Sequence, residues 1–162
     1  MASTLHMLCG KIASGKSTLA HQLVRDGGVL VAEDEWLGAL FGEQMKTGAD
    51  YMRCAGKLRS IMAPHLVSLL NAGTSIVLDF PANTVGQRGW MREILAGTTA
   101  DHQMHVLDTP DEDCLARLAK RNAAGDHPFA VTEDQFWQFS KHFSPPTADE
   151  GFNLILHHPR RA

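Results

Sequence analysis

Short apolar runs alternate with segments of helical periodicity along the whole chain. The runs occupy residues 5–9, 29–32, 75–79, 102–107 and 152–156, and each has the length of a buried strand. Between them, apolar residues recur every three or four positions, as they do on one face of an amphipathic helix. Strands that alternate with helices favour a parallel sheet with helices on both faces. The pattern therefore predicts a three-layer α/β fold.

The helical segments carry their own start signals. Residues 17–24 form the first helix, and the three acids at 33–35 lead into a short one that ends near Phe41. A longer segment, 47–71, contains Pro64, which we expect to kink or divide it. Three later helices are predicted from capping boxes, in which a threonine caps the helix and a Gln or Glu three residues later reciprocates. The boxes are Thr84 with Gln87, Thr109 with Glu112, and Thr132 with Gln135.

Composition bounds the class of protein. With 162 residues, 44% hydrophobic and 20% charged, the chain has the make-up of one globular domain over residues 1–162. The net charge of −3 argues against a protein that mainly grips a nucleic-acid backbone, because such domains are usually basic.

Location is predicted from what the sequence lacks. No apolar run reaches the length of a membrane span, and residues 1–4 do not resemble a secretory leader. The cysteines, at 9, 54 and 114, are too widely spaced for a zinc site or a disulfide framework. We therefore expect a cytoplasmic protein with no membrane partner.

The most specific motif is Gly-Lys-Ile-Ala-Ser-Gly-Lys-Ser at residues 10–17, between the first strand and the first helix. A G-x-x-x-x-G-K-[ST] loop in this position surrounds a polyphosphate with main-chain N–H groups and a helix N-terminus. Lys16 is expected to reach the β- and γ-phosphates, and the Ser17 hydroxyl to bind Mg²⁺. The predicted nucleotide-binding residues are Gly10, Lys11, Ile12, Ala13, Ser14, Gly15, Lys16, Ser17 and Thr18.

Two acidic segments follow predicted strands. Asp79 ends the third strand, where a carboxylate beside the loop holds Mg²⁺ directly or through water, although an Asp there also suits a turn or a cap. Residues 33–35 follow the second strand, and ligands of open α/β sheets lie at this end of the strands. We favour Asp34 as a base for an attacking hydroxyl; the alternative is that these acids only favour the start of the next helix.

Arginines supply the remaining candidates. Arg117 and Arg121 are four residues apart on one helix face and precede a Gly- and His-containing loop, so they predict a lid over approximately residues 117–131. Arginine charge at a phosphoryl-transfer transition state speeds the reaction, whereas the alternative is a solvated helix face. Arg88 and Arg92 also share a face and suit an anionic acceptor, or solvent.

Together these segments resemble the small P-loop kinases of the adenylate-kinase-like group. The similarity is closest to zeta-toxin-like and polynucleotide-kinase-like ATP-binding proteins, whose relatives include chloramphenicol phosphotransferase and gluconate kinase. It is carried by residues 10–20, 34–42, 77–79, 83, 87–88, 107–112 and 117–122. The resemblance implies a five-stranded parallel sheet with a mobile lid, a base at Asp34 and lid arginines at Arg117 and Arg121. Residues 80–82 depart from the small or hydroxyl residues of these relatives.

The combined expectation is an ATP- and Mg²⁺-dependent kinase that phosphorylates a hydroxyl of a small-molecule acceptor. Asp34, Lys16, Arg117 and Arg121 are its expected catalytic residues, and Ser17 and Asp79 its metal ligands. Two alternatives stay open: a polynucleotide 5′-hydroxyl kinase, and an ATP-binding switch that transfers no phosphoryl group. The sequence does not identify the acceptor, the oligomeric state or a preference for ATP over GTP.

Overall fold

The chain folds around a five-stranded parallel sheet. The computed structural model describes residues 2–125 and 130–158. The strands are ordered β2-β3-β1-β4-β5, and every neighbouring pair is parallel. They are β1 (Thr4–Cys9), β2 (Val29–Ala32), β3 (Ile76–Asp79), β4 (Asp101–Leu107) and β5 (Leu154–His157). The predicted α/β class and parallel sheet are confirmed.

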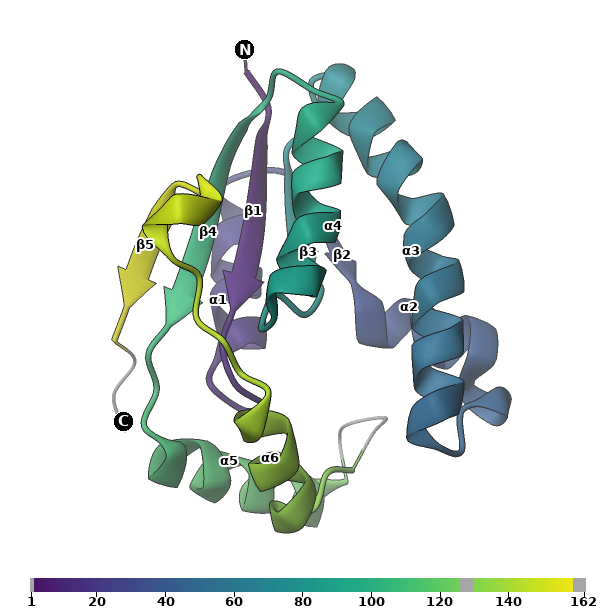
Figure 1. Cartoon of the computed structure of the whole chain (residues 1–162), viewed down its shortest axis with the longest axis vertical. Coiled ribbons are helices and arrows are strands. Elements are labelled where there is room, and N and C mark those ends of the chain that lie inside the picture. Colours follow the sequence, from purple (N-terminus) through teal and green to yellow (C-terminus); the bar gives the residue numbers. More distant parts are fainter. Residues whose placement is uncertain (1, 126–129, 159–162) are drawn as a thin grey trace.

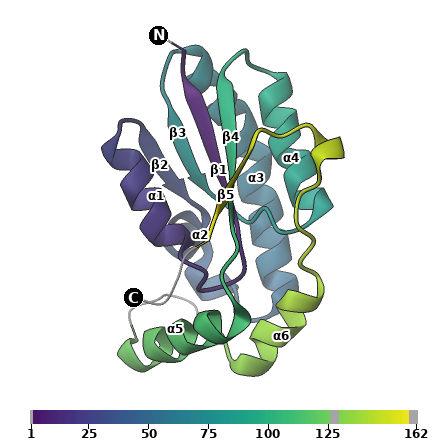
Figure 2. The same cartoon turned by 90° about the vertical axis from the view of Figure 1, so that its left-hand side faces the viewer.

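Helices cover both faces and one end of the sheet. They are α1 (Lys16–Arg25), α2 (Glu33–Phe41), α3 (Gly48–Asn71), α4 (Val85–Ala96), α5 (Asp111–Ala124) and α6 (Glu133–Lys141), with short 3₁₀ turns at Gly42–Gln44 and Ala148–Glu150. Figure 1 shows α5 and α6 beyond the carboxyl ends of the strands. In Figure 2, α1 lies on one face of the sheet, with α3 and α4 on the other.

The central strand β1 is buried on both sides because consecutive side chains enter different cores. Leu5, Met7 and Cys9 belong to the large core shared with α3 and α4. Leu8 packs with Ala20 of α1 in a smaller core on the opposite face. This arrangement explains the continuous apolar run, which is typical of a parallel strand with helices on both faces.

Of the two expected effects of Pro64, a kink or a division of the helix, division is wrong. Helix α3 continues through Pro64 from Gly48 to Asn71. Pro64 is exposed, so the proline lies on the solvent side of a helix whose other face packs into the core.

The capping predictions had mixed outcomes. The Thr132 box is complete, whereas the Thr84 oxygen accepts from the Gln87 amide without the full box. The Thr109 box is wrong: α5 follows Pro110, and the Thr109 hydroxyl donates instead to the Ser14 carbonyl oxygen, at 2.7 Å. A local sequence pattern at Thr109 was thus overridden by a contact 95 residues away.

The cysteines and the membrane prediction can also be compared with the structure. All three cysteines are buried and none forms a disulfide. Over the described ranges, no helix combines the length and the apolarity that a bilayer span requires.

Three histidines form a hydrogen-bonded row across β1, β4 and β5. His6 Nδ1 lies 3.0 Å from His105 Nε2, and His105 Nδ1 lies 2.9 Å from His157 Nε2. His105 is only 3% exposed. Burial, together with the neighbouring His6 and His157, lowers the pKa of His105 from 6.5 to about 4.

This depressed pKa predicts acid sensitivity. Between pH 6.5 and 4 the unfolded chain binds a proton at residue 105 that the folded chain does not, so stability is full above pH 6.5 and falls as the pH drops toward 4. By pH 4 this loss amounts to about 3 kcal/mol of the free energy of unfolding. Urea unfolding of wild type and His105→Gln from pH 7.5 to 4.5 should show a flatter pH dependence for the variant. Parallel profiles would contradict the assignment.

Candidate active site

The loop over residues 10–17 connects β1 to α1 through unusual backbone geometry. Ala13 has a φ of 61° and Gly15 a φ of 107°, both in the left-handed region. Left-handed residues that alternate with other conformations turn main-chain N–H groups toward a common centre, which is the geometry of an anion-binding nest. A Cβ at Gly10 would lie 2.5 Å from Ser14 Oγ, so any other residue there would displace the Ser14 hydroxyl.

Two side chains from distant segments hold this loop. The Asn83 Oδ1 accepts a hydrogen bond from the Gly10 amide at 2.9 Å, and the Thr109 hydroxyl donates to the Ser14 carbonyl at 2.7 Å. The sequence indicated a different role for Thr109 and none for Asn83. Both contacts join residues more than 70 positions apart, so no local pattern reports them.

Lys16 lies inside the loop. Its Nζ donates to the carbonyl oxygens of Gly10 and Lys11, at 2.7 and 2.8 Å. Burial lowers the pKa of the Lys16 ammonium, and the nearby carboxylates of Asp79 and Asp34 oppose that effect. The cation therefore lies between the loop and the two acids that the sequence placed at the same edge of the sheet.

Sheet register explains why those acids meet. Ala32 of β2 is paired with Asp79 of β3, and α2 begins at the next residue, Glu33. The first turn of α2 therefore follows directly beside Asp79. Asp34 in that turn is half-buried, and its charge acts on both Lys16 and Arg121.

The other two acids of the 33–35 segment differ from Asp34. Glu33 is 2% exposed and accepts hydrogen bonds from the Tyr51 hydroxyl at 2.5 Å and from Arg59 Nη2 at 3.3 Å. Burial raises the pKa of Glu33, with the Tyr51 hydrogen bond and the Arg59 charge acting against the increase. Glu35 is exposed. Glu33 thus links α2 to α3, which leaves Asp34 as the acid of this segment beside the lysine.

Helix α5 places Arg117 over the loop and Arg121 within range of the Asp34 charge. A Cβ on Gly15 would lie 3.2 Å from Arg117 Nη1, so this guanidinium covers the loop. Arg121 Nε is buried and has no hydrogen-bond partner within residues 2–125 and 130–158. Burial lowers the pKa of Arg121 and the Asp34 charge opposes the decrease. Part of the predicted lid at 117–131, residues 126–129, lies outside the described residues.

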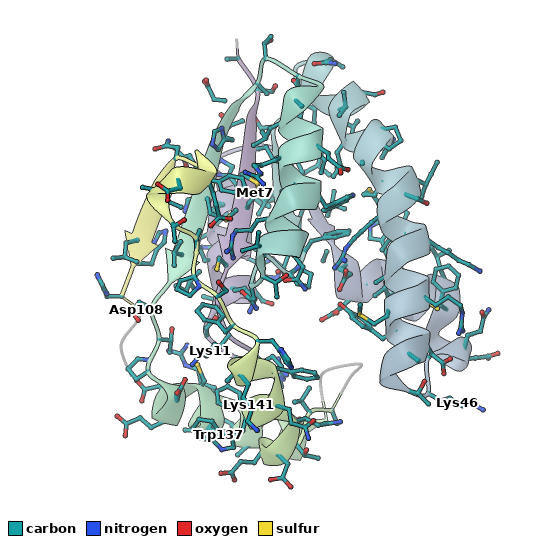
Figure 3. All side chains as sticks on the ribbon, viewed as in Figure 1. Met7, Lys11, Lys46, Asp108, Trp137 and Lys141 are labelled. Carbon is teal, nitrogen blue, oxygen red and sulfur yellow. The ribbon has the colours of Figure 1, made fainter. Side chains whose placement is uncertain are left out.

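Helices α5 and α6 reach the loop through a third small core. Cys114, Leu118 and Phe136 are buried together, and Ile12 and Ala13 of the loop pack against them. The Lys11 side chain pairs with Asp111 at 2.7 Å and lies 5.6 Å from the Phe143 ring centre. Figure 3 shows Lys11 between the sheet and α5, far from Lys46. Lys11 therefore contributes main-chain groups to the nest, with its side chain occupied elsewhere.

Side-chain oxygens at the carboxyl edge of the sheet are suitable ligands for Mg²⁺. Ser17 and Thr18 are exposed at the start of α1, and Asp79 is half-buried beside Lys16. Within the described part of the chain, no group of three or more His, Cys, Asp or Glu residues forms a metal site. Mg²⁺ does not require one, because it is commonly held by one or two protein oxygens, water and substrate phosphates.

The suggestion that Arg88 faces an acceptor or solvent is wrong. Arg88 is 0% exposed, and its Nε pairs with Glu150 at 2.7 Å. Its partner is 62 residues away in a 3₁₀ turn, so the helical spacing with Arg92 did not reveal it.

Comparisons with known proteins agree with this architecture. The family model AAA_33, described as an AAA domain, matches residues 5–146. No curated protein matches the chain significantly.

Solved structures share the fold at low sequence identity. A sugar kinase from Janibacter sp. HTCC2649 is 19% identical, with 98% of this chain and 86% of that chain covered and a TM-score of 0.68. The Mycobacterium tuberculosis APS kinase CysC, in complex with AMPPNP and APS, is also 19% identical, with coverages of 99% and 91% and a TM-score of 0.68. Kti12 from Chaetomium thermophilum, in complex with ADP-AlF3, is 13% identical, with coverages of 95% and 88% and a TM-score of 0.71. These similarities establish the fold.

The loop backbone gives a stability prediction. Ala13 has a left-handed φ that costs an L-residue about 1–2 kcal/mol, whereas glycine at such a site loses about 0.5–1 kcal/mol through unfolded-state entropy. Ala13→Gly should therefore raise the free energy of unfolding by up to about 1 kcal/mol. Gly15→Ala, the matched reverse change, should lower it. Chemical denaturation measures both, and a destabilised Ala13→Gly variant would contradict the strain at this position.

Proposed function

The chain belongs to the AAA_33 family and has the fold of the small P-loop kinases, and from this premise we propose that it is an ATP- and Mg²⁺-dependent kinase acting on a small-molecule hydroxyl. The observation that carries the proposal is the clustering of Lys16, Asp34, Asp79 and Arg121 at the carboxyl edge of the sheet. Phosphate binding alone requires only the loop; a carboxylate base next to it supports transfer.

The loop and Lys16 bind the triphosphate in this proposal. Main-chain N–H groups of the loop donate to phosphate oxygens, except those already bonded within the protein, such as that of Gly10 to Asn83. The N-terminus of α1 adds its positive dipole. Nucleotide binding exchanges the Lys16 contacts with the Gly10 and Lys11 carbonyls for contacts with the β- and γ-phosphates. The lysine is thus already held within the loop before the nucleotide arrives.

Asp34 serves as the base. Its carboxylate accepts the proton of the acceptor hydroxyl as the hydroxyl oxygen bonds to the γ-phosphorus and the bond to the bridging β–γ oxygen breaks. ADP leaves with that oxygen. The half-buried position of Asp34 leaves it accessible to an acceptor that approaches from the carboxyl edge.

Arg117 and Arg121 supply positive charge over the phosphoryl group. Arg117 already lies over Gly15, and the buried Arg121 Nε is a donor suited to an anionic oxygen. Ser17 and Asp79 would hold Mg²⁺, which neutralises charge on the β- and γ-phosphates when bound. Closure of the 117–131 segment over the nucleotide stays a prediction.

The acceptor side favours a small molecule over a polynucleotide. The net charge is −3, and Asp34 is flanked by Glu33 and Glu35, so no basic surface leads to it along α2. Strand-binding proteins instead track the phosphate backbone with a positive groove. Three buried cysteines without disulfides suit a reducing compartment and support a cytoplasmic location.

Removing the loop lysine tests the phosphate site. Lys16→Ala should abolish phosphoryl transfer, because it removes the cation that lies inside the loop. Lys46→Ala, an exposed lysine before α3 and far from the loop, is the matched control and should leave turnover unchanged. Coupled-assay rates report both, and near-wild-type turnover by Lys16→Ala would remove the loop from the mechanism.

Amide substitutions test which acid is the base. Asp34→Asn should retain Mg–ATP affinity while lowering kcat by about 10²-fold or more. Glu33→Gln should mainly lower stability, because Glu33 ties α2 to Tyr51 and Arg59, and Glu35→Gln should be close to neutral. If the kcat loss appears in Glu33→Gln or Glu35→Gln instead, the base is misassigned.

An ADP-release screen tests the activity itself. Purified protein with Mg–ATP is assayed against sugars, aminoglycosides, other hydroxylated antibiotics, nucleosides and 5′-hydroxyl oligonucleotides. The proposal expects one class of small molecule to stimulate ADP release and to gain a phosphate by mass spectrometry. Stimulation only by oligonucleotides, with a steep salt dependence, would indicate a polynucleotide kinase. Nucleotide binding without stimulation by any compound would indicate a switch.

A further inference from the structure

We propose that Arg88 is a positioning residue for nucleotide binding, acting through Asn83 on the first amide of the phosphate-binding loop. The inference rests on the proposed function only in that the loop binds a nucleotide. It assigns a task to the largest fully buried side chain of the described residues, which the reaction outlined above does not use.

The Arg88 guanidinium joins three separate segments. Its Nε and Nη2 donate to the Glu150 carboxylate at 2.7 and 3.2 Å. Its Nη1 donates to the Ala82 carbonyl at 2.9 Å and to the Ser144 carbonyl at 2.7 Å. These acceptors lie before α4, after α6 and in the turn that precedes β5. A planar fork of donors can satisfy all three at once, which a lysine ammonium cannot do with the same geometry.

Two of those segments, the one before α4 and the one after α6, meet at Asn83. Ala82 is its chain neighbour, and the Ser144 amide donates to the Asn83 carbonyl at 2.8 Å. The Asn83 amide in turn donates to Gln87 Oε1 at 2.9 Å. Arg88 therefore anchors the backbone on both sides of this contact, through the carbonyls of Ala82 and Ser144.

With its main chain fixed, Asn83 directs its side-chain oxygen at the loop. Oδ1 accepts from the Gly10 amide at 2.9 Å and from the Cys9 thiol at 3.6 Å. A shift of Asn83 would therefore displace Gly10, and with it the start of the loop whose other amides bind phosphate.

Stability alone does not account for this ion pair, in which the Arg88 side chain is fully buried and the Glu150 side chain is 11% exposed. Replacing a buried ion pair with apolar residues of similar volume is often neutral or stabilising, because both charges lose their hydration. What an apolar side chain cannot supply is hydrogen bonds to three acceptors that fix the position of residues 82, 144 and 150. Arg88 therefore fixes the position of Asn83, the residue that holds the start of the loop.

A double-mutant cycle on nucleotide affinity tests the proposal. Calorimetry with Mg–ADP and no acceptor gives Kd for wild type, Asn83→Ala, Arg88→Lys and the double variant, at a temperature where each is folded. Each single change should weaken binding about 5- to 10-fold, the equivalent of one hydrogen bond. The double variant should bind no more weakly than Asn83→Ala, because Arg88 acts through that residue.

Matched controls separate positioning from general stability. Arg25→Lys changes an exposed arginine, and Asn71→Ala removes an amide that bonds the Gly97 carbonyl far from the loop; both should leave Kd unchanged. Glu150→Gln is a milder change at the same pair, for use if Arg88→Lys does not fold. It should weaken binding about 2- to 3-fold, again only when Asn83 is present.

The outcomes are distinct. A lower melting temperature with unchanged Kd in Arg88→Lys, or in Glu150→Gln if that variant replaces it, would overturn the positioning role. Losses that multiply in the double variant would show that Arg88 does not act through Asn83, and would also overturn it. If the cycle behaves as expected but wild type phosphorylates no acceptor, the kinase proposal fails and the positioning role stands.

Discussion

The structure depends on one constraint: a short loop after β1 must turn its main-chain N–H groups inward and still lead directly into a helix. Left-handed residues at Ala13 and Gly15 make that turn, at a conformational cost for Ala13. Such geometry persists only where the surroundings determine it. Here Asn83 and Thr109 hold the two ends of the loop, and a small core under Ile12 and Ala13 supports its middle.

The strand order brings the other residues of the site to this loop. Since β1 lies between β3 and β4, the segments that follow its neighbours reach the loop from opposite sides. The β3 side supplies Asp79 and Asn83, and β2 next to it supplies Asp34. The β4 side supplies Thr109 and then the arginines of α5. Opposite charges therefore converge on the loop from both sides, which suits a polyphosphate and an acceptor that must lose a proton.

Features encoded in neighbouring residues were predictable from the sequence. Apolar periodicity gave the strands and most helices, and the glycine-lysine spacing located the loop. Acids after β2 and β3 were expected at one edge because parallel strands share it, and the charge of both Asp34 and Asp79 acts on Lys16. The predictions for Thr109 and Arg88 failed because a residue distant in sequence determines each contact. The Thr109 hydroxyl donates to the Ser14 carbonyl, and Arg88 pairs with Glu150. Pro64 does not divide its helix, and its exposed position, which a local pattern does not report, is compatible with that continuity.

The central claim is that main-chain amides of residues 10–18, with Lys16, bind a nucleoside triphosphate. The most direct measurement is an amide-resolved NMR titration of the ¹⁵N-labelled protein with Mg–AMPPNP. The account predicts saturable shifts that are largest for the amides of this loop, with smaller changes at Asp34 and along α5, and little change in β5. Saturable shifts confined to another surface, or no shifts at millimolar nucleotide, would contradict it.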